Sequence, residues 1–181
     1  MPSGKIHDRI TWICLPPVVA GGLVVTRDII LTLCSSVAFV FSGLMFGPDL
    51  DIYSLQFKRW GFLRFIWLPY QKLLRHRSFL SHGILIGTMG RVVYFVSVVL
   101  AMVVLWGIIG KLILGVSWDW REWIVAGYTE VKENYWQETM AVFLGLELGA
   151  MSHYLADIGE NWRQSHIQLK ARRKKRRGRK K

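Results

Sequence analysis

Residues 92–110 (VVYFVSVVLAMVVLWGIIG) form an apolar stretch that contains no charged residue. A helix of about 20 apolar residues is long enough to cross a ~30 Å hydrocarbon core. Residues 29–48 are also uncharged, and two weaker apolar stretches flank this pair. Residues 10–26 carry no charge, and residues 139–156 carry only Glu147. The pattern predicts an all-α protein built as a four-helix transmembrane bundle.

The chain length and composition fit a single membrane domain followed by a basic tail. The chain has 181 residues, of which 52% are hydrophobic, and its mean hydropathy is +0.28. Ten of the last twelve residues, 170–181 (KARRKKRRGRKK), are basic. Such a run does not bury a core and is expected to be disordered. We therefore predict a transmembrane metal-binding domain over residues 1–160 and a basic cytoplasmic tail over residues 161–181.

The distribution of Lys and Arg predicts the orientation in the membrane. If the N-terminus is cytoplasmic, residues 1–9, 49–81 and 158–181 lie on that side and hold 19 of the 24 Lys and Arg residues. This satisfies the positive-inside rule and predicts a multi-pass protein with both termini in the cytoplasm. Arg91, close to the start of the third helix, is expected to extend toward the membrane interface. A buried pairing with Glu147 is the rarer alternative.

Two connecting segments are expected to lie at the membrane interface. In residues 53–75, Phe and Trp side chains are interleaved with Lys58, Arg59 and Arg64, which suits contact with anionic headgroups. These Phe and Trp residues are Phe57, Trp60, Phe62, Phe65 and Trp67. On the opposite side, Trp118, Trp120 and Trp123 are typical of an aromatic belt.

The predicted topology places histidines and aspartates together at the cytoplasmic helix ends. An even number of spans returns all four of these ends to one side. The residues there are His7, Asp8, Asp49, Asp51, His76, His82, His153 and Asp157. His153 and Asp157 are four residues apart and share a helix face. Asp49 and Asp51 follow the Gly47-Pro48 break, where the backbone can turn both carboxylates toward one point.

Imidazole and carboxylate groups together suit zinc, manganese or iron, and this number of ligands accommodates one or two divalent ions. The predicted metal ligands are His7, Asp49, His76, His82, His153 and Asp157. Asp8 or Asp51 would orient a ligand or act as the general base. The alternative is that these residues are helix caps and polar residues at helix contacts.

Four short motifs resemble a family of small, uncharacterised membrane proteins described as metal-binding: SGKIHD (3–8), GPDLD (47–51), HRSFLSH (76–82) and HYLAD (153–157). The resemblance covers residues 1 to about 160. More distantly, the pattern is similar to the membrane-bound metal-dependent hydrolase family. That similarity implies a metal site formed by the matching His and Asp residues.

Three functions are compatible with the sequence. The first is a metal-dependent hydrolase that acts on a phosphoester or lipid-like substrate at the cytoplasmic interface, since a metal lowers the pKa of bound water toward 7. The second is a non-catalytic membrane protein stabilised by its metal. The third is a tether whose basic tail binds anionic lipid headgroups or nucleic acid.

Overall fold

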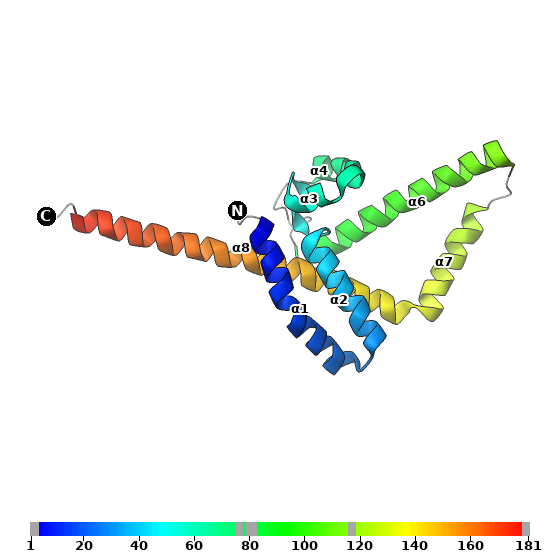
Figure 1. Cartoon of the computed structure of the whole chain (residues 1–181). Coiled ribbons are helices and arrows are strands. Elements are labelled where there is room, and N and C mark those ends of the chain that lie inside the picture. The colour runs from blue at the N-terminus through cyan, green and yellow to red at the C-terminus, as the bar shows by residue number, and fades with distance from the viewer. Residues whose placement is uncertain (1–3, 75–77, 79–82, 116–118, 179–181) are drawn as a thin grey trace.

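The computed structural model describes residues 4–74, 78, 83–115 and 119–178, and all regular elements within them are helical (Figure 1). The prediction of an all-α protein is therefore confirmed. The elements are α1 (Gly4–Thr26), α2 (Ile29–Leu44), η1 (Pro48–Asp51), α3 (Leu55–Arg59), η2 (Gly61–Trp67), α4 (Leu68–Leu73), α6 (Ile86–Leu114), α7 (Trp120–Asn134) and α8 (Trp136–Gly178).

The packing centre is a three-helix unit in which α2 contacts both α1 and α8. Small residues allow the close approach. A Cβ atom on Gly145 would lie 2.1 Å from the Ser35 carbonyl oxygen, and one on Gly149 would lie 2.6 Å from the Phe39 carbonyl oxygen. The Ser42 hydroxyl donates a hydrogen bond of 2.6 Å to the Leu146 carbonyl. These contacts hold the part of α8 that leads to His153 against α2.

The close contact at Gly145 predicts opposite effects for two chemically identical substitutions on α8. Gly145→Ala would push the new methyl group into the Ser35 backbone, and we expect a loss of about 1–3 kcal/mol in unfolding free energy. At Gly159 an added Cβ meets no atom within 4 Å. Gly159→Ala should therefore leave stability unchanged or raise it by up to ~1 kcal/mol through helix propensity. Denaturant unfolding in detergent measures both, and equal effects would contradict this account of the packing.

Side chains from the α3 region satisfy the carbonyls at the C-terminal end of α2. The last carbonyls of a helix lack intrahelical partners. Gln56 donates to the Gly43 carbonyl at 2.9 Å, and Arg59 donates to the Leu44 carbonyl at 2.9 Å. The Trp60 indole donates to the Met45 carbonyl at 2.9 Å. These three bonds fix the segment after α2, including η1, against the bundle.

The segment predicted to be interfacial is divided between core and surface. Phe62 and Phe65 are exposed, in agreement with that prediction. Phe57 and Trp67 are instead buried in an apolar cluster with Tyr70 and residues of α2, η1 and α8. They are therefore core residues and not surface anchors, because α3, η2 and α4 fold back on one another.

Among the residues that the structure describes, two helices are long and apolar enough to cross a membrane: Ile6–Thr26 of α1 and Ile86–Leu114, which is α6. The predicted four-helix transmembrane bundle is not confirmed for the other two segments. Helix α2 has 16 residues and spans about 24 Å, because it ends at Leu44 ahead of the Gly47-Pro48 break. In the fourth segment, the apolar part of α8 carries Glu147 and leads into the polar residues around His153.

The basic tail continues as a helix, since α8 extends to Gly178 (Figure 1). The expectation of a disordered tail from residue 170 is wrong for the part that the structure describes. Lys, Arg and Ala favour helix, and the packed part of α8 already supplies the nucleus that an isolated tail would lack. The domain boundary predicted after residue 160 falls inside this helix and stays a prediction.

Candidate metal centre

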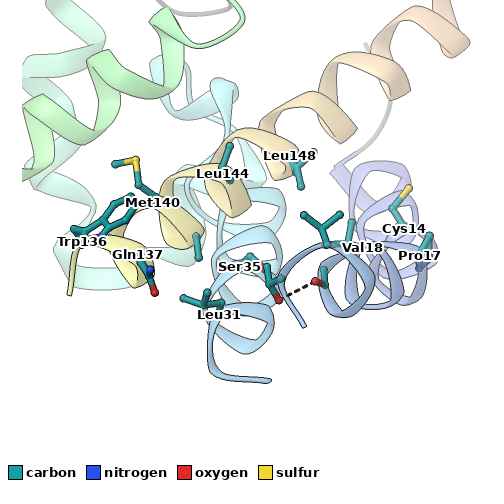
Figure 2. Close-up of a pocket in the computed structure, with 15 residues that line it drawn as sticks. Cys14, Pro17, Val18, Leu31, Ser35, Trp136, Gln137, Met140, Leu144 and Leu148 are labelled. Carbon is teal, nitrogen blue, oxygen red and sulfur yellow. Dashed lines mark hydrogen bonds between the residues drawn. The ribbon is translucent and has the colours of Figure 1, made fainter. Parts of the chain in front are cut away.

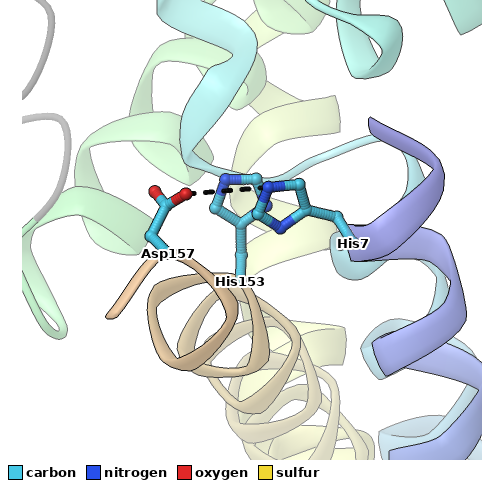
Figure 3. Close-up of side chains that lie close together, drawn as sticks. All are labelled: His7, His153 and Asp157. Carbon is cyan, nitrogen blue, oxygen red and sulfur yellow. Dashed lines mark ion pairs between the residues drawn. The ribbon is translucent and has the colours of Figure 1, made fainter. Parts of the chain in front are cut away.

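Two histidines from opposite ends of the chain meet where α1 begins and where α8 leaves the bundle (Figure 3). His7 lies in the first turn of α1, and its carbonyl accepts a hydrogen bond from the Thr11 hydroxyl. His153 lies one turn beyond Gly149, the residue that packs on Phe39. The two imidazole rings stack with centroids 3.8 Å apart and an interplanar angle of 14°. Both residues are buried, with exposures of 6% and 3%.

A carboxylate lies next to each imidazole. His7 Nε2 is 3.7 Å from Asp157 Oδ1 (Figure 3), and Asp157 comes one turn after His153 on α8. His153 Nε2 is 3.3 Å from Asp49 Oδ2 on η1. One ligand atom from each of His7, His153 and Asp157 lies within 4.8 Å of the others. The sequence prediction thus named four residues that the structure brings together, although their role as ligands stays a prediction.

The chemistry of this cluster fits a divalent cation. Within the part of the chain that the structure describes, the buried Nδ1 atoms of His7 and His153 make no hydrogen bond, and His153 Nε2 makes none either. Buried polar atoms are normally paired, so such atoms require another explanation, for example a bound ion. Two protonated imidazoles stacked at this distance would repel each other, whereas neutral imidazoles are metal ligands. Nitrogen and carboxylate donors together suit zinc, manganese or iron.

Asp8 and Asp51, the two aspartates predicted to orient a ligand or act as the general base, lie in different environments. Asp8 forms a two-point ion pair with Arg59, with contacts of 2.8 Å and 2.5 Å to the two guanidinium nitrogens. This hydrogen bonding raises the pKa of Arg59. Asp51 is buried and is close enough to Tyr70 and Tyr154 for its charge to act on both. Asp8 is therefore engaged as a structural partner, and Asp51 belongs to a buried polar group beside the centre.

The comparisons agree with metal binding. Residues 2–167 match the family described as "Uncharacterized metal-binding protein (DUF2227)". The chain belongs to this family. It is also similar to an uncharacterized protein of Aquifex aeolicus (strain VF5), with 32% identity over 59 residues that cover 32% of this chain and 41% of that relative. No solved structure matches the chain.

The remaining predicted ligands, His76 and His82, lie outside the residues that the structure describes. The fifth histidine, His166, is exposed on α8 with its ring 4.2 Å from that of Trp162. The described part of the centre therefore consists of His7, His153, Asp157 and Asp49.

A buried polar group lies next to the centre, and the sequence predicted the burial of Arg91 only as the rarer alternative. Arg91 of α6 is fully buried and donates a hydrogen bond of 2.8 Å to Thr88, so the expectation that it extends to the interface is wrong. Glu147 is buried on α8 and accepts a hydrogen bond of 3.0 Å from the Leu85 backbone N–H. Burial raises the pKa of Tyr70 to about 12, with the nearby Arg91 charge opposing the shift. An ionisable residue inside an apolar run is the signal that could have identified Arg91 and Glu147.

The Asp8–Arg59 pair predicts a non-additive effect on stability. Asp8→Ala and Arg59→Ala should each lower the unfolding free energy, and the double variant should lose less than the sum. We expect a coupling of about 1 kcal/mol, since the side chains are 22% and 29% exposed and solvent screens them. A double-mutant cycle measured by denaturant unfolding gives this value. Strict additivity would show that the pair contributes nothing to stability.

Proposed function

We propose that this chain is an integral membrane protein that uses a divalent metal ion to hydrolyse a phosphoester at the cytoplasmic face of the membrane. The observation that carries the proposal is the pair of buried, stacked imidazoles of His7 and His153 with a carboxylate beside each of them. A purely structural core has little use for two buried imidazoles whose Nδ1 atoms make no hydrogen bond among the described residues.

The exposed apolar surface supports the membrane location. Helix α6 is the more apolar of the two candidate spans, and none of its most apolar 18-residue stretch is buried. The corresponding stretch of α1 is 6% buried. In a water-soluble protein, the apolar side chains of a core helix would be buried against other elements. The Lys and Arg distribution then orients the metal centre and both termini toward the cytoplasm.

The proposed ligands are His7, His153, Asp157 and Asp49, with His76 and His82 completing the set from the segment that precedes α6. When bound, a divalent ion would act as a Lewis acid and lower the pKa of water toward 7. Asp51 is the proposed general base, because it lies two residues after Asp49 and is not part of the Asp8–Arg59 pair. Asp8 is proposed to orient the first turn of α1, which carries His7, through Arg59.

Zinc is the proposed ion, with manganese or iron as alternatives, because the donors are imidazole nitrogen and carboxylate oxygen. Four described ligands suffice for one ion. Two further histidines would allow a second ion to be held, in line with two-metal phosphoester hydrolases.

Hydrolysis by the purified full-length chain in detergent micelles tests the proposal. We expect turnover of a phosphomonoester or phosphodiester substrate that stops on chelation, returns with added Zn²⁺, and is absent from Asp51→Asn although this variant retains metal. Stoichiometric metal without turnover on phosphoesters would contradict the catalytic part. A large drop in melting temperature on chelation would then assign the ion a structural role.

A further inference from the structure

An apolar groove of about 740 Å³ lies between α1, α2 and α8 (Figure 2). Helix α1 contributes Cys14, Val18 and Val25 to one wall, and α8 contributes Met140 and Leu144 to the other. Helices α1 and α8 are also the helices that carry His7, His153 and Asp157. One pair of helices therefore forms both the metal centre and the groove.

The two hydroxyl groups that line the groove are satisfied within the protein. The Thr26 hydroxyl donates to the Gly22 carbonyl at 2.9 Å, and the Ser35 hydroxyl donates to the Thr32 carbonyl at 3.0 Å. Gln137, at the Trp136 end, is exposed. An occupant thus meets apolar side chains and hydroxyl groups that are already bonded. This favours a hydrocarbon occupant over water or a polar ligand, which would bring hydrogen-bonding groups without partners.

The groove follows the face of α1 that carries His7. His7, Cys14 and Gly21 are seven residues apart, which places them on nearly the same side of a helix. Cys14 lies about 10 Å and Val25 about 27 Å from His7 along the helix axis. The groove is therefore about 17 Å long and crosses the midplane of a ~30 Å hydrocarbon core, so that a chain whose head lies near His7 must be long and extended to fill it.

We propose that this groove binds an acyl chain of the substrate, so that the substrate is a long-chain amphiphile whose phosphoester lies at the metal centre. The proposal rests on the proposed function. The groove selects substrates by chain length, because only a chain that extends well beyond Cys14 fills its distal half.

Gly21 allows this to be tested without disturbing the packing. A Cβ at Gly21 meets no atom within 4 Å, and Gly21 lines the groove, so Gly21→Leu would fill it. Gly110 of α6 is equally open but lies outside the groove, so Gly110→Leu is the matched control. Leu144→Trp is a second groove-filling variant on the other wall, for use if Gly21→Leu does not fold.

The probe is phosphatidic acid with a diazirine near the end of a long acyl chain, reconstituted with the full chain in phosphatidylcholine nanodiscs. We expect photo-adducts on groove residues such as Met140. Gly21→Leu should lower them about tenfold relative to adducts on α6, and Gly110→Leu should not. Equal groove labelling in wild type, Gly21→Leu and Gly110→Leu would overturn the proposal. An absence of groove labelling, as expected if a second copy of the chain occupied the groove, would also overturn it.

A comparison of substrates separates the failure of the groove from the failure of the proposed function. Gly21→Leu should lower kcat/KM about tenfold for a dioleoyl phosphoester and leave that for a dihexanoyl phosphoester unchanged. Groove labelling without any hydrolysis would support the acyl-chain site and refute the hydrolase. Hydrolysis that depends neither on chain length nor on Gly21→Leu would support the hydrolase and refute the acyl-chain site.

Discussion

Replacing His153 by alanine is expected to remove the bound metal from the purified protein. The affinity for a divalent ion should fall by at least about 100-fold, since even residues that only orient a ligand change metal affinity by ~10–100-fold. His153 is buried, its ring stacks on that of His7, and its Nε2 is 3.3 Å from Asp49. Removing it takes away one donor and also leaves the His7 ring without the surface that orients it.

His166→Ala is the matched control for this prediction. His166 lies on the same helix, but it is exposed and stacks on Trp162. The His166→Ala variant should therefore keep the metal content of wild type. Metal analysis and chelator competition measure the content and the affinity. In addition, an ion that binds only the folded state at 100 times its Kd stabilises that state by ~2.7 kcal/mol, so wild type and His166→Ala should gain stability with added Zn²⁺ while His153→Ala should not. Metal retention by His153→Ala would place the ion elsewhere.

The α8 part of the centre could be predicted because its determinants are local. Gly145, Gly149, His153 and Asp157 recur every four residues, so one helix face carries both the packing contact and the candidate ligands. The Gly47-Pro48 break similarly marked the turn that holds Asp49. In both cases, helix periodicity or a backbone break fixes the position of the side chain without reference to distant residues.

The parts that could not be predicted depend on contacts between distant residues. Nothing in the spacing of Asp8 indicates that Arg59, 51 residues away, would pair with it. The stacking of His7 on His153 depends on how closely α1 and α8 approach, which the sequence pattern does not specify. The helical tail was missed because composition favours disorder for an isolated segment, whereas this segment continues a helix that is already formed.

Replacing Arg91 by alanine is expected to lower the unfolding free energy by about 3–5 kcal/mol, the range for removing one member of a buried charged group. Arg91 is fully buried on α6. Arg91, Asp51 and Glu147 all lie close enough to Tyr154 to act on its charge. Without the guanidinium, two buried carboxylates lose a neighbouring cation, and the side chain of Thr88 loses its hydrogen-bond donor.

Lys111→Ala provides the control on the same helix, because Lys111 is exposed in the last turn of α6 and should change stability by less than ~0.5 kcal/mol. Denaturant unfolding in detergent gives both values. Arg91→Lys separates charge from geometry: it keeps the cation but loses the planar set of donors. A lysine variant as unstable as the alanine variant would show that the guanidinium hydrogen bonds hold α6 to the bundle. An alanine variant as stable as wild type would show that Arg91 has no part in organising the residues beside the metal centre.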